Sequence, residues 1–177
     1  MDSACSLDAS SLCSHLLPLA QATKTYLCSL TEKGTEVIDM AKLKATAKWV
    51  GNARLIADNS RAHTVMLDLP KESGGEDSGP TPLELALMSL AGCAATMYVD
   101  IAKRSGVELT NLVAVVEAEK PKGSPKLTSA NLKLKVSGKA REQLLEIMWR
   151  KAEEKCPVTS IFKDSIPVKT ELEASAE

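Results

Sequence analysis

Aromatic residues are scarce in this 177-residue chain, which holds two Trp, two Tyr and one Phe. A hydrophobic core must therefore consist mainly of Leu, Val, Ile, Ala and Met, and few rings are present on which nucleic-acid bases could stack. The chain also lacks an excess of either charge, because 22 basic and 23 acidic residues give a formal net charge of -1. A basic excess or patch normally marks a nucleic-acid-binding protein, so we expect no nucleic-acid partner.

Histidine is rare as well. The chain has two His residues and no Cys/His cluster, which argues against a zinc site. Neither the G-x-G-x-x-G pattern nor the G-x-x-x-x-G-K-[ST] pattern occurs, so nucleotide binding has no support from a motif.

The cysteines do not form the regular framework of a secreted, disulfide-rich protein. Their number is odd and their spacing irregular, since they stand at Cys5, Cys13, Cys28, Cys93 and Cys156. We therefore expect free thiols in the reducing environment of the cytoplasm.

The first 39 residues differ in composition from the rest. Residues 1–39 are rich in Ser, Leu, Thr and Ala, and they hold no Arg, two Lys and five acidic residues. A mitochondrial transit peptide is rich in Arg and poor in acidic residues, and a secretory signal begins with basic residues, so neither description fits. We interpret residues 1–39 as a peripheral or poorly ordered extension, and residues 40–177 as one domain.

Turn residues divide this domain into short segments of alternating or helical hydrophobicity. Strands are predicted over residues 43–50, 54–58, 63–69, 109–120, 126–136 and 167–172. Helices are predicted over residues 81–105 and 139–155, and the pattern of residues 160–165 is unclear. Because neighbouring strands follow one another directly, this order indicates an α+β fold rather than a doubly wound sheet. The first three strands suggest a meander.

The longer predicted helix has clear end signals. Thr81 is a candidate N-cap, Pro82 occupies the first helical position and Glu84 the third, while Gly106 ends the helix. Its apolar residues cover every face, so we expect burial on all sides. A membrane span is the alternative, but the most apolar run, residues 85–99, would extend only about 22 Å, less than a ~30 Å hydrocarbon core. We therefore expect no membrane association.

Two cysteines raise the question of function. Cys93 falls midway along this apolar helix, where a cysteine is commonly a small core residue. Cys156 precedes Pro157, which suits the first position of a new helical turn, and a thiolate at such a position is stabilised by backbone N–H groups. An ordinary exposed thiol is the alternative for Cys156, and the residues alone do not indicate that the two cysteines meet.

Three motifs make the chain resemble one known family. The stretch G-G-E-D-S-G-P-T-P-L-E-L at residues 74–85, followed by L-A-G-C at residues 90–93, strongly resembles the OsmC/Ohr family. The C-P-V-T motif at residues 156–159, 63 residues after Cys93, is similar to the second cysteine motif of that family, and I-P-V at residues 166–168 also fits. The resemblance covers roughly residues 41–173, and it is greatest to the broad OsmC-like subgroup.

The resemblance implies a fold of antiparallel sheets wrapped around long, central, buried helices in an intertwined homodimer, with active sites at the subunit interface. It also implies thiol-dependent peroxidase chemistry in oxidative stress defence. Cys93 would attack the O–O bond of an organic hydroperoxide and become a sulfenic acid, and Cys156 would condense with it to a disulfide. An external dithiol would then reduce the pair, with no metal or organic cofactor required.

A buried thiolate requires a cation and hydrogen bonds. In the peroxidases of the family, a Glu ten residues before the helix cysteine holds an Arg near the sulfur, but here Leu83 stands at that position and Glu84 one residue later. Nine helical positions place Glu84 about 180° around the helix from Cys93, so Glu84 is either a catalytic carboxylate or only an N-terminal helix residue. Arg54, in an early strand, is the candidate cation, with Arg61 as the alternative.

The resemblance leaves two classes of function open. One is a cysteine-based hydroperoxidase, and the other is a redox-sensing or small-ligand-binding protein of the same fold without efficient turnover. A purely structural dimer is less favoured because both motif cysteines are present.

Overall fold

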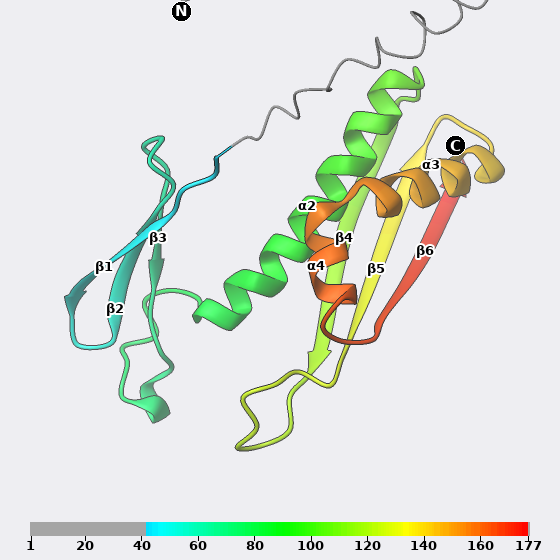
Figure 1. The fold of residues 1–177 in the computed structure, drawn as a ribbon. Helices are drawn as coiled ribbons and strands as arrows, with labels where there is room; N and C mark the ends of the chain where they lie inside the picture. The colour runs from blue at the N-terminus through cyan, green and yellow to red at the C-terminus, as the bar shows by residue number, and fades with distance from the viewer. Residues whose placement is uncertain (1–41, 177) are drawn as a thin grey trace, which may run out of the picture. The chain divides into compact units, whose positions relative to one another are not determined.

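A computed structural model describes residues 42–176 of the chain. The extension predicted over residues 1–39 lies outside the described residues. The described part has the predicted α+β organisation, with two three-stranded sheets and three α-helices (Figure 1).

The first sheet is the predicted meander. Strands β1 (Thr46–Gly51), β2 (Arg54–Asp58) and β3 (Thr64–Leu67) pair antiparallel in the order β1-β2-β3. The β1–β2 hairpin turns at Asn52 and Ala53, directly after Gly51, and the φ angles of Gly51 and Asn52 are 122° and 49°. Glycine and asparagine accept positive φ at little steric cost, which is why this pair predicted the turn.

A compact loop connects β3 to the first long helix, and one buried carboxylate organises it. Asp68 accepts four hydrogen bonds, from the N–H groups of Leu69, Glu76 and Ser78 and from the Ser78 hydroxyl, at 2.7–3.1 Å. Burial raises the pKa of Asp68, but these hydrogen bonds outweigh burial and lower the pKa to about 2. A Cβ at Gly75 would lie 1.9 Å from the Leu69 carbonyl oxygen, so only glycine fits this close approach.

Helix α2 (Pro82–Arg104) begins and ends where the sequence predicted. Thr81 is the N-cap: its side chain accepts the Glu84 N–H, and the Glu84 carboxylate accepts the Thr81 N–H, which is a complete capping box. Ser105 is the C-cap, and Gly106 follows with a φ of 67°.

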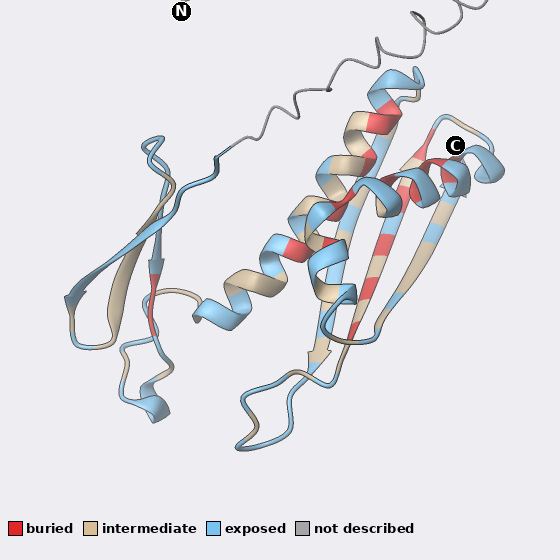
Figure 2. Cartoon of the chain, viewed as in Figure 1, coloured by how far each residue is buried: buried red, intermediate tan, exposed pale blue. Residues whose placement is uncertain are grey.

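Burial along α2 differs from the prediction. Within the single chain only one face is buried, and it carries Leu90, Ala94, Tyr98, Ile101 and Ala102 (Figure 2). Met88, Gly92 and Thr96 on another face are exposed. Burial on all sides is therefore wrong for the single chain, because one small sheet and two other helices cover only one side of a 23-residue helix.

The second sheet contains β4 (Leu109–Glu119), β5 (Ser129–Gly138) and β6 (Val168–Ala176) in the order β4-β5-β6. Strands β4 and β5 are antiparallel, but β6 runs parallel to β5, which differs from the antiparallel sheets implied by the resemblance. The reason is the connection: helices α3 (Glu142–Lys155) and α4 (Pro157–Lys163) intervene and return the chain to the same end of the sheet.

The core lies between this sheet and the helices. It joins Leu132 and Leu134 of β5 to Leu145 of α3 and to Leu90 and Tyr98 of α2, all fully buried. The Tyr98 hydroxyl donates to the Leu145 carbonyl at 3.2 Å and so links α2 to α3. Burial raises the pKa of Tyr98 to about 12.

Among residues 42–176, α2 is the one helix long and apolar enough to cross a membrane. The core helix of a soluble protein meets the same criterion, and α2 contributes five residues to the core of this chain.

Candidate functional site

Cys93 lies near the middle of α2, beside its buried face. It follows the fully buried Leu90 by three residues and precedes the buried Ala94, and its own side chain is partly exposed. Cys93 lies about 60° around the helix from Leu90 and about 100° from Ala94, so it stands at the border between the core and the exposed face.

Cys156 lies at the junction of α3 and α4. It is 1% exposed, and it is both the C-cap of α3 and the N-cap of α4, with Pro157 at the first helical position as predicted. Its sulfur accepts the Thr159 N–H at 3.4 Å. The extended backbone at Cys156, with φ -78° and ψ 107°, separates the two helices and directs the thiol into the core.

The fold brings these two cysteines together. The Cys93 and Cys156 sulfur atoms are 2.8 Å apart, and the Cys156 thiol donates to the Cys93 sulfur. Both are free thiols. Because an S–S bond is about 2.05 Å long, the two sulfurs would form one after an approach of less than about 1 Å. The arrangement is therefore a dithiol poised for reversible oxidation.

The surroundings of Cys93 favour the neutral thiol. Burial raises the pKa of Cys93, and the hydrogen bond in which the protonated Cys93 thiol donates to Cys156 and the charge of a Cys156 thiolate raise it further, while the Val158 N–H lowers it. No Lys, Arg or His of residues 42–176 contributes to this shift. Within the part of the chain that the structure describes, Cys93 thus has no neighbouring cation of the kind that lowers the pKa of a nucleophilic thiol.

Arg54 is bound to a carboxylate of the compact loop. Its guanidinium forms an ion pair with Glu76 at 3.2 Å, and its Nε is buried without a hydrogen-bond partner. Asp68 accepts the backbone N–H of Glu76 and so fixes the loop that carries this carboxylate. Arg61, the alternative cation, is exposed, and Arg104, the last residue of α2, pairs with Asp100 at 3.0 Å.

Glu84 has a complete structural role at the start of α2. Its carboxylate accepts the Thr81 N–H at 2.7 Å, and the backbone and side-chain hydrogen bonds with Thr81 lower the pKa of Glu84. A direct part for Glu84 in the reaction remains a prediction, as does the assignment of Arg54.

Sequence reasoning assigned no role to four residues around these groups: Val158, Thr159, Asp68 and Glu76. Val158 and Thr159 belong to the C-P-V-T motif, and the motif was the only signal for them. Asp68 follows a strand and precedes a glycine-rich loop, where a carboxylate commonly accepts nearby backbone N–H groups. Glu76 is 22 positions from Arg54 in the sequence, and no local pattern indicates their contact.

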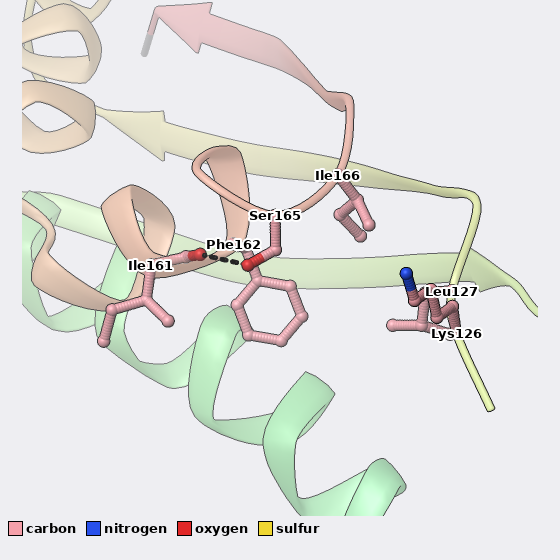
Figure 3. Close-up of a pocket in the computed structure, with 6 residues that line it drawn as sticks. All are labelled: Lys126, Leu127, Ile161, Phe162, Ser165 and Ile166. Carbon is pink, nitrogen blue, oxygen red and sulfur yellow. Dashed lines mark hydrogen bonds between the residues drawn. The ribbon is translucent and has the colours of Figure 1, made fainter.

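A pocket of about 520 Å³ lies beside the second half of α4 (Figure 3). Apolar side chains form most of its wall, and its lining consists of Lys126, Leu127, Ile161, Phe162, Ser165 and Ile166. The Ser165 hydroxyl donates to the Ile161 carbonyl. Neither Cys93 nor Cys156 is among the described residues that line it. No three His, Cys, Asp or Glu side chains within residues 42–176 gather where they could hold a metal ion.

Comparison with known proteins agrees with this fold. Protein YhfA of Escherichia coli K12 is 23% identical over 137 residues, which cover 76% of this chain and 99% of YhfA. A hypothetical protein from Aquifex aeolicus VF5 superposes with a TM-score of 0.67 at 21% identity, covering 78% of this chain and 99% of that one. An organic hydroperoxide resistance protein OsmC from Legionella pneumophila superposes with a TM-score of 0.59 at 20% identity, covering 76% of this chain and 98% of that one.

The family model described as OsmC-like protein matches residues 75–171, a segment that contains both Cys93 and Cys156. Since this match spans more than half of the sequence, the chain belongs to the OsmC-like protein family.

Proposed function

We propose that this protein is a thiol peroxidase that reduces organic hydroperoxides with Cys93 and Cys156 in oxidative stress defence. The observation that carries the proposal is the contact of the two thiols, 2.8 Å apart in a largely apolar setting. Membership of the OsmC-like family and likeness to an organic hydroperoxide resistance protein favour the same chemistry.

The proposed cycle has three steps. The Cys93 thiolate attacks the O–O bond of ROOH, takes one oxygen as sulfenic acid, and releases ROH after the alkoxide gains a proton. The Cys156 sulfur then attacks the Cys93 sulfur, the S–O bond breaks, and the oxygen leaves as water while the disulfide forms. An external dithiol supplies two electrons and two protons to restore both thiols. The apolar surroundings favour an organic hydroperoxide over hydrogen peroxide.

A direct test measures hydroperoxide consumption with tert-butyl hydroperoxide and a dithiol donor. Cys93→Ser should abolish consumption, whereas Cys156→Ser should permit one oxidation and then over-oxidation of Cys93 because no second thiol resolves the sulfenic acid. Cys28→Ser, which removes a cysteine outside the pair, is the matched control. Full activity of Cys93→Ser would overturn the assignment.

The exposed face of α2 supports a homodimer as part of the proposal. Met88 is 57% exposed in the single chain, and a Cβ at Gly92 would meet nothing within 4 Å, so this apolar face is open to a second copy. Sedimentation at micromolar concentration should give a dimer. Gly92→Trp should shift it to a folded monomer, while Lys122→Trp in the β4–β5 turn should not; a wild-type monomer would refute the proposal.

We assign the missing cation to Arg54. A cation beside Cys93 would counter the effect of burial on the pKa of this thiol, and no basic side chain of residues 42–176 does so within one chain, so Arg54 would reach Cys93 across the subunit interface of the proposed dimer. The Arg54 guanidinium retains an unpartnered buried N–H, and Glu76 holds it in place. Arg54→Ala should slow the oxidation of Cys93, and Arg61→Ala is the control. A slow reaction in Arg61→Ala alone would move the assignment to Arg61.

One observation favours a second candidate, a redox sensor that is oxidised without efficient turnover. The raised pKa of Cys93 keeps its thiol neutral, and neutral thiols react slowly with peroxides. Steady consumption of hydroperoxide over many equivalents per protein identifies an enzyme, whereas a single oxidation that the dithiol reverses only slowly identifies a sensor.

A further inference from the structure

Thr159 has a buried hydroxyl with no hydrogen-bond partner. The residue is 1% exposed, and its Oγ1 is one of three buried side-chain atoms without a partner in residues 42–176, together with Arg54 Nε and Asn131 Oδ1. The large majority of buried side-chain polar atoms in proteins have a partner, and an unsatisfied hydroxyl opposes folding. A function of the hydroxyl would explain why the chain retains a group that opposes folding.

The position of Thr159 supplies that explanation. Its backbone N–H donates to the Cys156 sulfur at 3.4 Å, and the N–H of the preceding residue, Val158, acts on the Cys93 sulfur. The first turn of α4 therefore adjoins both thiols. Three covalent bonds join Oγ1 to its own backbone nitrogen, so the hydroxyl lies within about 4 Å of that nitrogen. Since that nitrogen is 3.4 Å from the Cys156 sulfur, the unpartnered hydroxyl lies within about 7 Å of this sulfur.

The resting thiols offer this hydroxyl a poor acceptor, since a thiol sulfur accepts hydrogen bonds weakly. Oxidation changes the chemistry of the site, because Cys93 then carries an oxygen atom. An oxygen is a much better acceptor, and it must leave as water when the disulfide forms. A donor fixed in a water-poor site before the reaction requires no reorganisation when charge develops on the leaving oxygen.

We propose that the Thr159 hydroxyl hydrogen-bonds the oxygen of the Cys93 sulfenic acid and stabilises this oxygen as it leaves. The Cys156 sulfur attacks the Cys93 sulfur, the S–S bond forms, and the electron pair of the broken S–O bond goes to the oxygen. The proton released by the Cys156 thiol converts that oxygen to water, and Thr159 keeps its own proton. This inference rests on the sulfenic acid step of the proposed function.

The test compares Thr159→Val, which removes only the hydroxyl, with Thr159→Ser, which keeps it. Reduced protein is mixed with one equivalent of tert-butyl hydroperoxide, and two rates are followed: loss of hydroperoxide and formation of the Cys93–Cys156 disulfide. In Thr159→Val, disulfide formation should slow by about 10- to 100-fold, the factor that corresponds to one hydrogen bond to a charged group. Dimedone should trap more sulfenic acid, and Thr159→Ser should restore the rate.

The same variant separates this role from a structural one. Because the hydroxyl has no partner at rest, Thr159→Val should melt at the same temperature as the wild type or higher. Thr170→Val is the matched control, since it removes a hydroxyl that bonds Glu153 at 3.0 Å away from the thiols, and it should leave disulfide formation unchanged.

The outcomes separate the two proposals. If Thr159→Val forms the disulfide as fast as the wild type, the role of Thr159 is refuted while the peroxidase assignment stands. If the wild type forms the disulfide with one equivalent but does not turn over with a dithiol, the peroxidase fails, and the ratio of disulfide rates still decides the role of Thr159. A wild type that forms no disulfide refutes both.

Discussion

Oxidation of the Cys93–Cys156 pair should make the protein markedly more resistant to unfolding. The two residues are 63 positions apart in the sequence, on α2 and at the junction of α3 and α4, so a bond between them would close a long loop in the unfolded chain. Reduced and oxidised protein have the same sequence, and the comparison therefore isolates the effect of one covalent bond.

The number of residues in this loop determines how much the disulfide stabilises the folded protein. In the chain-entropy model, a loop of this length loses enough freedom in the unfolded state to stabilise the folded protein by about 4 kcal/mol. The folded state needs little adjustment, because the sulfurs are already 2.8 Å apart. For a protein of this size, about 4 kcal/mol corresponds to a rise in melting temperature of roughly 8–16 °C.

Urea and thermal unfolding, each followed by circular dichroism, measure this difference. Protein oxidised with one equivalent of hydroperoxide is compared with protein kept in excess dithiol, and Cys93→Ser should behave the same under both conditions. If oxidation raises the free energy of unfolding of the wild type by less than about 0.5 kcal/mol, or lowers it, the fold does not accommodate a disulfide between Cys93 and Cys156.

Three further predictions concern the elements that position the site. Asp68→Asn should be less stable than the wild type at neutral pH. Because the pKa of Asp68 is lowered to about 2 from an ordinary 3.8, the urea midpoint of the wild type should decrease as the pH is lowered from about 4 to about 2. This decrease should be absent in the variant. Thr81→Ala should lower the free energy of unfolding by about 1 kcal/mol through loss of the cap on α2, and Glu84→Gln should be more stable than Glu84→Ala because it keeps the acceptor of the capping box. Tyr98→Phe should cost about 1 kcal/mol in urea unfolding, since it removes the hydrogen bond to Leu145, and an unchanged midpoint would contradict that bond.

Local signals in the sequence predicted most of the elements that surround the site. Thr81, Pro82 and Glu84 gave the start of α2 because a capping box depends on residues within one helical turn. Strand β2 has the predicted bounds, and Gly51 with Asn52 gave the turn before it. These features depend on neighbours in the sequence, so a pattern of a few residues is sufficient to reveal them.

Features that depend on distant residues could not be predicted in this way. Helix α4 has seven residues, too few for a hydrophobic period, and the parallel pairing of β6 depends on where two helices return the chain. The meeting of Cys93 and Cys156 was expected only from the family resemblance, because 63 residues separate them. The pairing of Arg54 with Glu76 likewise requires the loop that Asp68 closes.

The unequal exposure of the two cysteines has a consequence for the return half of the proposed cycle. Cys93 is partly exposed, whereas Cys156 is 1% exposed beneath the start of α4. A reducing thiolate that attacks the disulfide from solvent therefore reaches the Cys93 sulfur first, and Cys156 departs as the leaving thiolate, with the Thr159 N–H beside it to stabilise the charge. The transient mixed disulfide would then join the reductant to Cys93, until the second thiol of the dithiol attacks the reductant's own sulfur and releases Cys93 as a free thiol.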